Sequence, residues 1–127
     1  MDAGVLIEEA TRRSGVVWVT PDGADRAQPV WHLWQDGAMY VVTGGIEQPL
    51  EVTALATVTV RSNATQADRV VTWVADVSPV PPASPLWDEV VPLLHAKRLN
   101  APDGEEQPQR WARESTVLRF TPTGETR

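Results

Sequence analysis

The clearest pattern in the chain is a pair of apolar-rich runs between residues 29 and 45, on either side of the dipeptide Asp36-Gly37. Asp-Gly suits a two-residue type I′ turn, because both central residues of that turn need positive φ. Such a turn predicts a β-hairpin and fixes its register. The opposed residues would then be Gln35–Ala38, Trp34–Met39, Leu33–Tyr40, His32–Val41 and Trp31–Val42.

Both faces of this hairpin are largely apolar, because side chains alternate from one face of a strand to the other. One face carries Val30, His32, Trp34, Met39, Val41 and Thr43. The other carries Trp31, Leu33, Tyr40 and Val42. Removing apolar surface from water lowers the free energy of the folded state, so both faces should be covered. We expect one face to meet the chain's own core and the other to meet a loop, a ligand or a second subunit.

Elsewhere the pattern predicts mainly strands with a few helices. Strands are expected at residues 16–20, 57–61, 70–77 and 116–120. Helices are expected at residues 5–13, within 46–56, at 84–97 with an interruption at Pro92, and for one turn around Trp111. With the hairpin this makes about six strands, and short connections imply antiparallel pairing. The expected fold is a mainly β barrel with a few helices, in a single domain of residues 1–127.

Composition narrows the classes of partner. The net charge of −6 argues against a nucleic-acid or anionic-membrane surface, because both need clustered Lys and Arg. No stretch approaches the ~20 apolar residues of a membrane span, and the N-terminal residues do not resemble a signal peptide. Without Cys there is no disulfide or thiolate metal site. We therefore expect a cytoplasmic protein without a nucleic-acid or membrane partner.

Motifs of hydrolases, metal enzymes and dinucleotide-binding proteins are missing from the sequence. His32 and His95 are the two histidines, and neither stands at ligand spacing from acidic residues. His32, among aromatic residues, is expected in a core or an interface. There is no Gly-x-Ser-x-Gly elbow. The pair Gly44-Gly45 lacks the remaining glycines of a dinucleotide fingerprint and by itself indicates a turn.

Arg61 is the most promising anion ligand in the pattern. It ends an alternating Thr/Val strand and shares a face with Thr57 and Thr59, so its guanidinium could meet a phosphate beside two hydroxyls. The alternative is a solvated arginine at a strand end. The chain has six Trp but only one Tyr and one Phe. These Trp side chains can belong to the core, or one or two of them can stack on a planar ligand.

The order of these elements resembles that of the pyridoxamine 5′-phosphate oxidase-like proteins, the FMN-binding split β-barrels that include deazaflavin-dependent oxidoreductases. Three segments carry the resemblance: the hairpin Pro-Val-Trp-His-Leu-Trp-Gln-Asp-Gly-Ala-Met-Tyr-Val-Val-Thr-Gly-Gly, the helix entered through Trp87-Asp88, and Lys97-Arg98-Leu99-Asn100. The resemblance as a whole covers roughly residues 5–121. The resemblance implies a six-stranded antiparallel split barrel that forms a homodimer, with FMN or a deazaflavin in a groove between the subunits.

The resemblance also implies which residues meet the cofactor. Its phosphate would lie after the third strand and along the next one, and its ring against the hairpin. The residues at the phosphate positions are Thr43, Gly44, Gly45, Gln48 and Arg61, and those at the ring are Trp31, His32 and Trp34.

The sequence departs from the family pattern at the phosphate position. No Lys or Arg occurs between Tyr40 and Val60, and Glu47 and Glu51 bring negative charge there. Two like charges about 4 Å apart repel by on the order of 4 kcal/mol at an effective dielectric constant of ~20. Two hypotheses follow. The chain is a flavin- or deazaflavin-dependent oxidoreductase that transfers hydride to or from a small hydrophobic substrate, or a cofactor-free homologue that binds a small molecule or serves as a dimeric structural domain.

Overall fold

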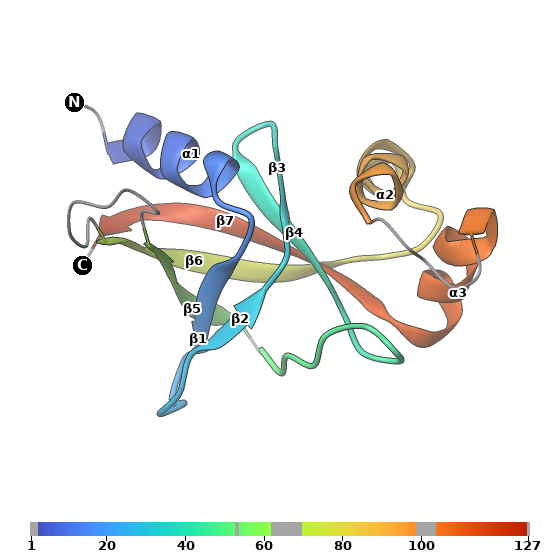
Figure 1. Cartoon of the computed structure of the whole chain (residues 1–127), viewed down its shortest axis with the longest axis horizontal. Coiled ribbons are helices and arrows are strands. Elements are labelled where there is room, and N and C mark those ends of the chain that lie inside the picture. The colour runs from blue at the N-terminus through green and yellow to red at the C-terminus, as the bar shows by residue number, and fades with distance from the viewer. Residues whose placement is uncertain (1–2, 53, 62–69, 99–103, 127) are drawn as a thin grey trace.

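Seven antiparallel strands form one sheet with the order β2-β1-β5-β6-β7-β4-β3, in a computed structural model that describes residues 3–52, 54–61, 70–98 and 104–126 (Figure 1). The strands are β1 (Val17–Pro21), β2 (Gln28–Val30), β3 (Leu33–Gln35), β4 (Ala38–Thr43), β5 (Leu55–Arg61), β6 (Val70–Val80) and β7 (Thr116–Thr126). The helices are α1 (Ala3–Arg13), α2 (Pro85–Lys97), η1 (Gly104–Glu106) and α3 (Gln107–Glu114).

The predicted hairpin forms around Asp36 and Gly37, whose φ angles of 47° and 80° are both positive as a type I′ turn requires. Three of the five expected pairs are present: Leu33↔Tyr40, Trp34↔Met39 and Gln35↔Ala38. The other two are not, because β3 begins only at Leu33. The preceding residues 28–30 form β2 and pair with β1 instead. This short strand makes the count seven, against the six expected.

Three other expectations are corrected by the structure. The helix expected within residues 46–56 is absent from the described part of that segment, which is irregular up to β5. Helix α2 runs unbroken through Pro92, and β6 runs through Pro79 to Val80. The amide of Val77 donates to Ala54, so the nitrogen of Pro79 points to the same side, beyond the last paired residue of β5. Proline is tolerated there because no ladder bond is lost.

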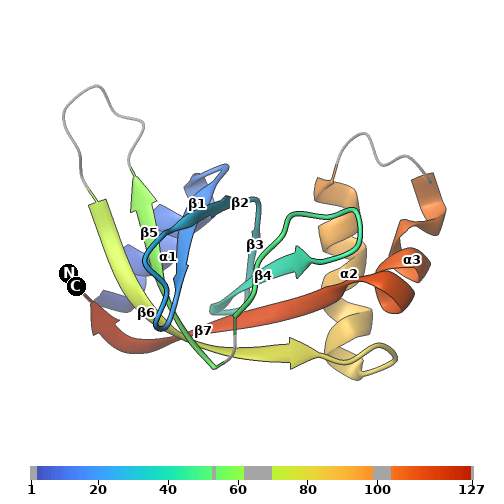
Figure 2. The same ribbon diagram turned by 90° about the horizontal axis from the view of Figure 1, so that it is seen from below.

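The sheet buries one apolar cluster on each of its faces. Inside the curl of the sheet, Trp73, Phe120, Met39 and their neighbours pack with Ile7 of α1. On the opposite face, α2 and α3 cover the end of the sheet formed by β4 and β7 (Figures 1 and 2), and Trp111 packs there with Tyr40 and the apolar side of α2. The chain's own helices therefore cover the second face of the hairpin, and that face does not require a partner subunit.

The connection between β2 and β3 explains why the sheet curls. These strands are the two edges of the sheet, yet only Trp31 and His32 separate them in sequence. The three Cα–Cα steps from Val30 to Leu33 span at most about 11 Å, so the two edges must approach each other. The His32 ring is buried, and its Nε2–H donates to the carbonyl oxygen of Thr11 on α1 at 2.7 Å. The carbonyl of His32 accepts a hydrogen bond from Nζ of Lys97 on α2. His32 therefore ties both helices to the barrel closure.

None of the described helices is both long enough and apolar enough to cross a membrane.

The burial of His32 should make stability depend on pH. Desolvation lowers the pKa of His32 from 6.5 to about 4, so the folded protein holds this ring neutral while the unfolded chain protonates it near 6.5. The stabilisation is complete above pH 6.5 and is lost as the pH falls towards 4. The loss amounts to about 3 kcal/mol of unfolding free energy, at 1.36 kcal/mol per pKa unit.

Urea denaturation of the wild-type protein and of His32→Gln at several pH values tests this expectation. Glutamine keeps a donor for Thr11 without a titrating group. Carboxylates titrate in both proteins, so the difference between the two curves isolates His32. A difference that stays constant from pH 7 to 4 would contradict the assignment.

Candidate functional site

The turn that follows β4 is folded back onto the start of β7. Gly44 and Gly45 have φ angles of 87° and 64°, which favour glycine. The carbonyl of Gly44 accepts hydrogen bonds from the amide of Glu47 (3.0 Å) and from Oγ of Ser115 (3.0 Å). A Cβ atom at Gly45 would lie 3.1 Å from the carbonyl oxygen of Glu114. The two glycines thus allow a close approach between this turn and the α3–β7 junction.

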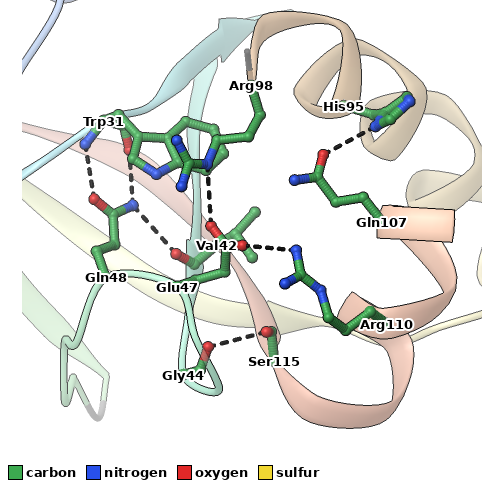
Figure 3. A network of polar contacts seen from close by, with 10 residues as sticks. All are labelled: Trp31, Val42, Gly44, Glu47, Gln48, His95, Arg98, Gln107, Arg110 and Ser115. Atoms are coloured by element: carbon green, nitrogen blue, oxygen red, sulfur yellow. Dashed lines mark hydrogen bonds and ion pairs between the residues drawn. The ribbon is translucent and has the colours of Figure 1, made fainter. Parts of the chain in front are cut away.

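Gln48 holds the barrel closure through its side-chain amide (Figure 3). Its Oε1 accepts the amide N–H of Trp31 at 2.9 Å, and its Nε2 donates to the carbonyls of Trp31 (3.0 Å) and Val42 (3.2 Å). The side chain thereby pairs with Trp31 in the way that a neighbouring strand would. All the hydrogen-bonding atoms of this amide have backbone partners, so a ligand would have to displace them.

Glu47 is a buried carboxylate between two arginines. Its side chain is 1% exposed, its Oε2 accepts a hydrogen bond from Nη2 of Arg110 at 3.1 Å, and its Oε1 lies 3.4 Å from Nε of Arg98 (Figure 3). Arg110 lies on α3 and is also largely buried, whereas Arg98 follows α2 and is 37% exposed. A buried carboxylate is stabilised only when it is paired in this way. Glu47 therefore points inward and supplies the anion that these arginines need.

Trp31 lies beside this ion cluster. The guanidinium carbon of Arg98 is 5.6 Å from the centre of the Trp31 ring, which is a cation–π contact. The Trp31 and Trp111 rings have centroids 6.3 Å apart and planes tilted by 37°. Trp31 is therefore packed between an arginine and a second indole.

The remaining predicted ring residues lie elsewhere. His32 is fully buried, and Trp34 packs edge-on against Trp73 in the inner cluster, with ring centroids 6.2 Å apart. Trp31 belongs to the outer cluster beneath α2 and α3. Trp31 and Trp34 therefore lie on opposite faces of the sheet, with His32 buried between them in sequence. A single chain does not place these three side chains around one cofactor ring.

Arg61 is far from the turn within one chain. It pairs with Val70 at the start of β6, whereas Thr43 pairs with Thr116 of β7, next to the far end of β6. Ten residues of β6 separate these ends, roughly 30 Å at ~3.3 Å per residue. Arg61 is exposed, shares a face with Thr57 and Thr59 as expected, and lies 5.5 Å from the centre of the Trp18 ring. It reaches a ligand at the turn only if that ligand is shared with another copy.

The phosphate position therefore does not fit a phosphate in a single chain. Thr43 is buried in β4, the Gln48 amide is committed to the backbone, and Glu47 already neutralises the nearby arginines. A phosphate within about 4 Å of that carboxylate would meet a repulsion on the order of 4 kcal/mol at an effective dielectric constant of ~20. Sequence reasoning missed the inward orientation of Glu47 because its arginine partners come from distant segments.

An open groove lies between the β1–β2 connection and the segment after Gln48. Its volume is about 490 Å³, within the range of small-molecule sites. The lining includes Pro21, Arg26, Gln28, Pro49, Leu50 and Glu51. No group of three or more His, Asp or Glu side chains that could hold a metal ion occurs in the part of the chain that the structure describes.

Known structures share this fold over nearly the whole chain. The heme storage protein HutZ from Vibrio cholerae matches with a TM-score of 0.68 and 16% identity, over 100% of this chain and 94% of that protein. A candidate pyridoxamine 5′-phosphate oxidase from Listeria innocua matches with a TM-score of 0.67 and 14% identity, over 98% and 95%. An FAD-binding protein from Mesorhizobium loti matches with a TM-score of 0.60 and 12% identity, over 96% and 88%.

No protein-family model and no curated protein sequence matches the chain. The structural likeness confirms the predicted fold, that of the pyridoxamine 5′-phosphate oxidase-like split barrels. At identities of 12–16% the likeness concerns the fold alone.

Replacing Gln48 should weaken the barrel closure. Gln48→Ala removes three hydrogen bonds, each worth about 1 kcal/mol net, so we expect the unfolding free energy to fall by about 2–3 kcal/mol in urea denaturation. Gln109→Ala is the matched control, because Gln109 is exposed on α3 and its loss should cost less than about 0.5 kcal/mol. Equal losses in the two variants would show that Gln48 does not hold the closure.

Proposed function

We propose that this chain is a small-molecule-binding split-barrel protein that takes a planar ring of the flavin or deazaflavin type without anchoring it through a terminal phosphate. The observation that carries this proposal is the pairing of Glu47 with Arg98 and Arg110 at the phosphate position. The ring class is supported by the fold, which an FAD-binding protein and a candidate pyridoxamine 5′-phosphate oxidase share.

The groove beside Pro49 and Leu50 offers space for such a ring. Its volume of about 490 Å³ suits a tricyclic ring without a long polar tail, and Arg26 and Gln28 add donors at its edge. Hydride transfer to or from a small hydrophobic substrate is the activity that we propose for the loaded protein. The ring would supply that chemistry, and the chain would hold the ring and exclude water.

A homodimer is part of the proposal, because Arg61 meets a ligand near the turn only from a second copy. Helices α2 and α3 already cover the outer face of the hairpin, so the contact between copies has to use another surface. The inner side of the sheet is filled by the core. The surfaces that this leaves are the edge strands β2 and β3 and the outer face of β1 and β5 around Trp18 and Arg61.

A second candidate is a cofactor-free homologue that binds another small molecule or acts as a dimeric structural domain. It is favoured by the fact that Gln48, Glu47 and Trp31 all have partners within the chain. In this case the residues of the turn serve stability alone.

Ligand titrations separate the two candidates. The visible spectrum of the purified protein and quenching of Trp fluorescence by FMN, riboflavin and 5-deazariboflavin are the measurements. We expect riboflavin and FMN to bind within about threefold of each other, because Glu47 already neutralises Arg98 and Arg110 at the phosphate position. A preference for FMN above about tenfold, or 1.4 kcal/mol, would contradict the phosphate-free mode. Absence of colour and of quenching by all three would leave the cofactor-free candidate.

Light scattering tests the homodimer. We expect a dimer at micromolar concentration in the wild-type protein and in Leu93→Ser, whose substitution lies on the exposed side of α2. Arg61→Ala should leave the dimer intact and weaken FMN and riboflavin to the same extent, because the proposed binding mode does not use the phosphate. A monomer with a native circular dichroism spectrum would contradict the dimer and this role of Arg61 together.

A further inference from the structure

We propose that Arg98, Gln107 and Arg110 form an oxyanion-binding site whose resident anion is the chain's own Glu47 carboxylate, and that a phosphate group takes this position when the carboxylate is removed. The proposal goes beyond the ring-binding function above and does not depend on it. It concerns what the basic cluster recognises and why external phosphate is kept out of it.

The geometry is that of an anion site formed by separate elements. Arg98 comes from the end of α2 and Arg110 from α3, and their guanidiniums approach different oxygens of Glu47, at 3.4 and 3.1 Å. Guanidinium groups present several N–H donors each and suit carboxylate and phosphate alike. Arg98 is 37% exposed, so solvent reaches the cluster from its side.

Gln107 is an independent indication of a ligand at this place. It is fully buried, and its Oε1 accepts a hydrogen bond from Nδ1 of His95 at 2.9 Å. This hydrogen bond fixes the orientation of the amide. Its Nε2 has no hydrogen-bond partner among the described residues. In Figure 3 this nitrogen is directed away from His95, to the side on which Glu47 and Arg98 lie. A buried N–H without a partner is unfavourable, and a phosphate has more acceptor oxygens than a carboxylate.

Glu47 occupies the site because it is attached to the chain. A tethered group acts at an effective concentration that reaches millimolar for short flexible connections, so a free anion must exceed this to compete. Here the connection is short and is folded by Gly44 and Gly45 against Ser115. External phosphate is therefore excluded from the wild-type protein at ordinary concentrations.

The test replaces the resident carboxylate and adds inorganic phosphate. In Glu47→Gln two arginines lose their anion, and we expect the melting temperature to fall in chloride and to rise by about 5 °C or more when phosphate replaces chloride at equal ionic strength. The wild-type protein and Glu51→Gln, an exposed acid of the same segment, should respond to phosphate and chloride alike. The double variant Glu47→Gln/Gln107→Leu should lose most of the phosphate effect.

Direct titration of Glu47→Gln with phosphate should give an affinity at least tenfold above that of the wild-type protein. If Glu47→Gln is unfolded in chloride, the proposal requires it to refold in phosphate. Equal phosphate responses in Glu47→Gln, Glu51→Gln and the wild type, or failure to refold, would overturn the proposal. FMN and riboflavin then show whether the phosphate of a nucleotide also reaches the site: a gain for FMN alone shows that it does, and binding of inorganic phosphate alone limits the site to small ions.

Discussion

The structure depends on closing a sheet whose two edge strands are joined by only two residues. Trp31 and His32 leave β2 and enter β3, so the backbone groups between them lie outside any ladder. Backbone groups that leave water need partners. Gln48 supplies them for Trp31, and Lys97 supplies one for His32. The His32 ring then donates a hydrogen bond to the backbone carbonyl of Thr11, which holds α1 over the inner core. The side chains of Gln48 and Lys97, from two separate segments, thus replace the strand that is missing at the seam.

This demand for closure limits what the turn after β4 can do. The resemblance noted in the sequence implies a cofactor phosphate at this turn, whereas in the structure Gln48 forms hydrogen bonds with Trp31, and Glu47 links Arg98 after α2 to Arg110 of α3. If Gln48 or Glu47 turned towards a ligand, it would lose the hydrogen bonds or ion pairs that it forms within the fold. The same few residues therefore stabilise the closed barrel and withdraw the phosphate position from use. Under the proposed function, selectivity against phosphate would be a property of the fold rather than of a separate gate.

The features that sequence reasoning predicted are those set by local chemistry. Asp36-Gly37 requires a particular turn, and the helix expected at 84–97 and the strand expected at 70–77 are present as α2 and β6. The features it missed depend on contacts between distant segments. Nothing near Glu47 in the sequence reveals that arginines more than fifty residues later approach it. Arg61 ends β5 and the turn follows β4, so the two belong to consecutive parts of the chain. In the folded structure the length of β6 separates them.

The strand order has a consequence for how the chain assembles. β7, the last strand in the described sequence, lies between β6 and β4, so the β3–β4 ribbon joins the main sheet only after β7 is in place. Pairings between segments so far apart slow folding. During synthesis the two apolar faces of the β3–β4 ribbon are not fully covered until the segments up to β7 have been synthesised. The hairpin, which has the clearest local signal in the sequence, is thus also the segment most prone to aggregate during folding. We expect a chaperone that recognises apolar segments to bind the unfolded chain at this hairpin.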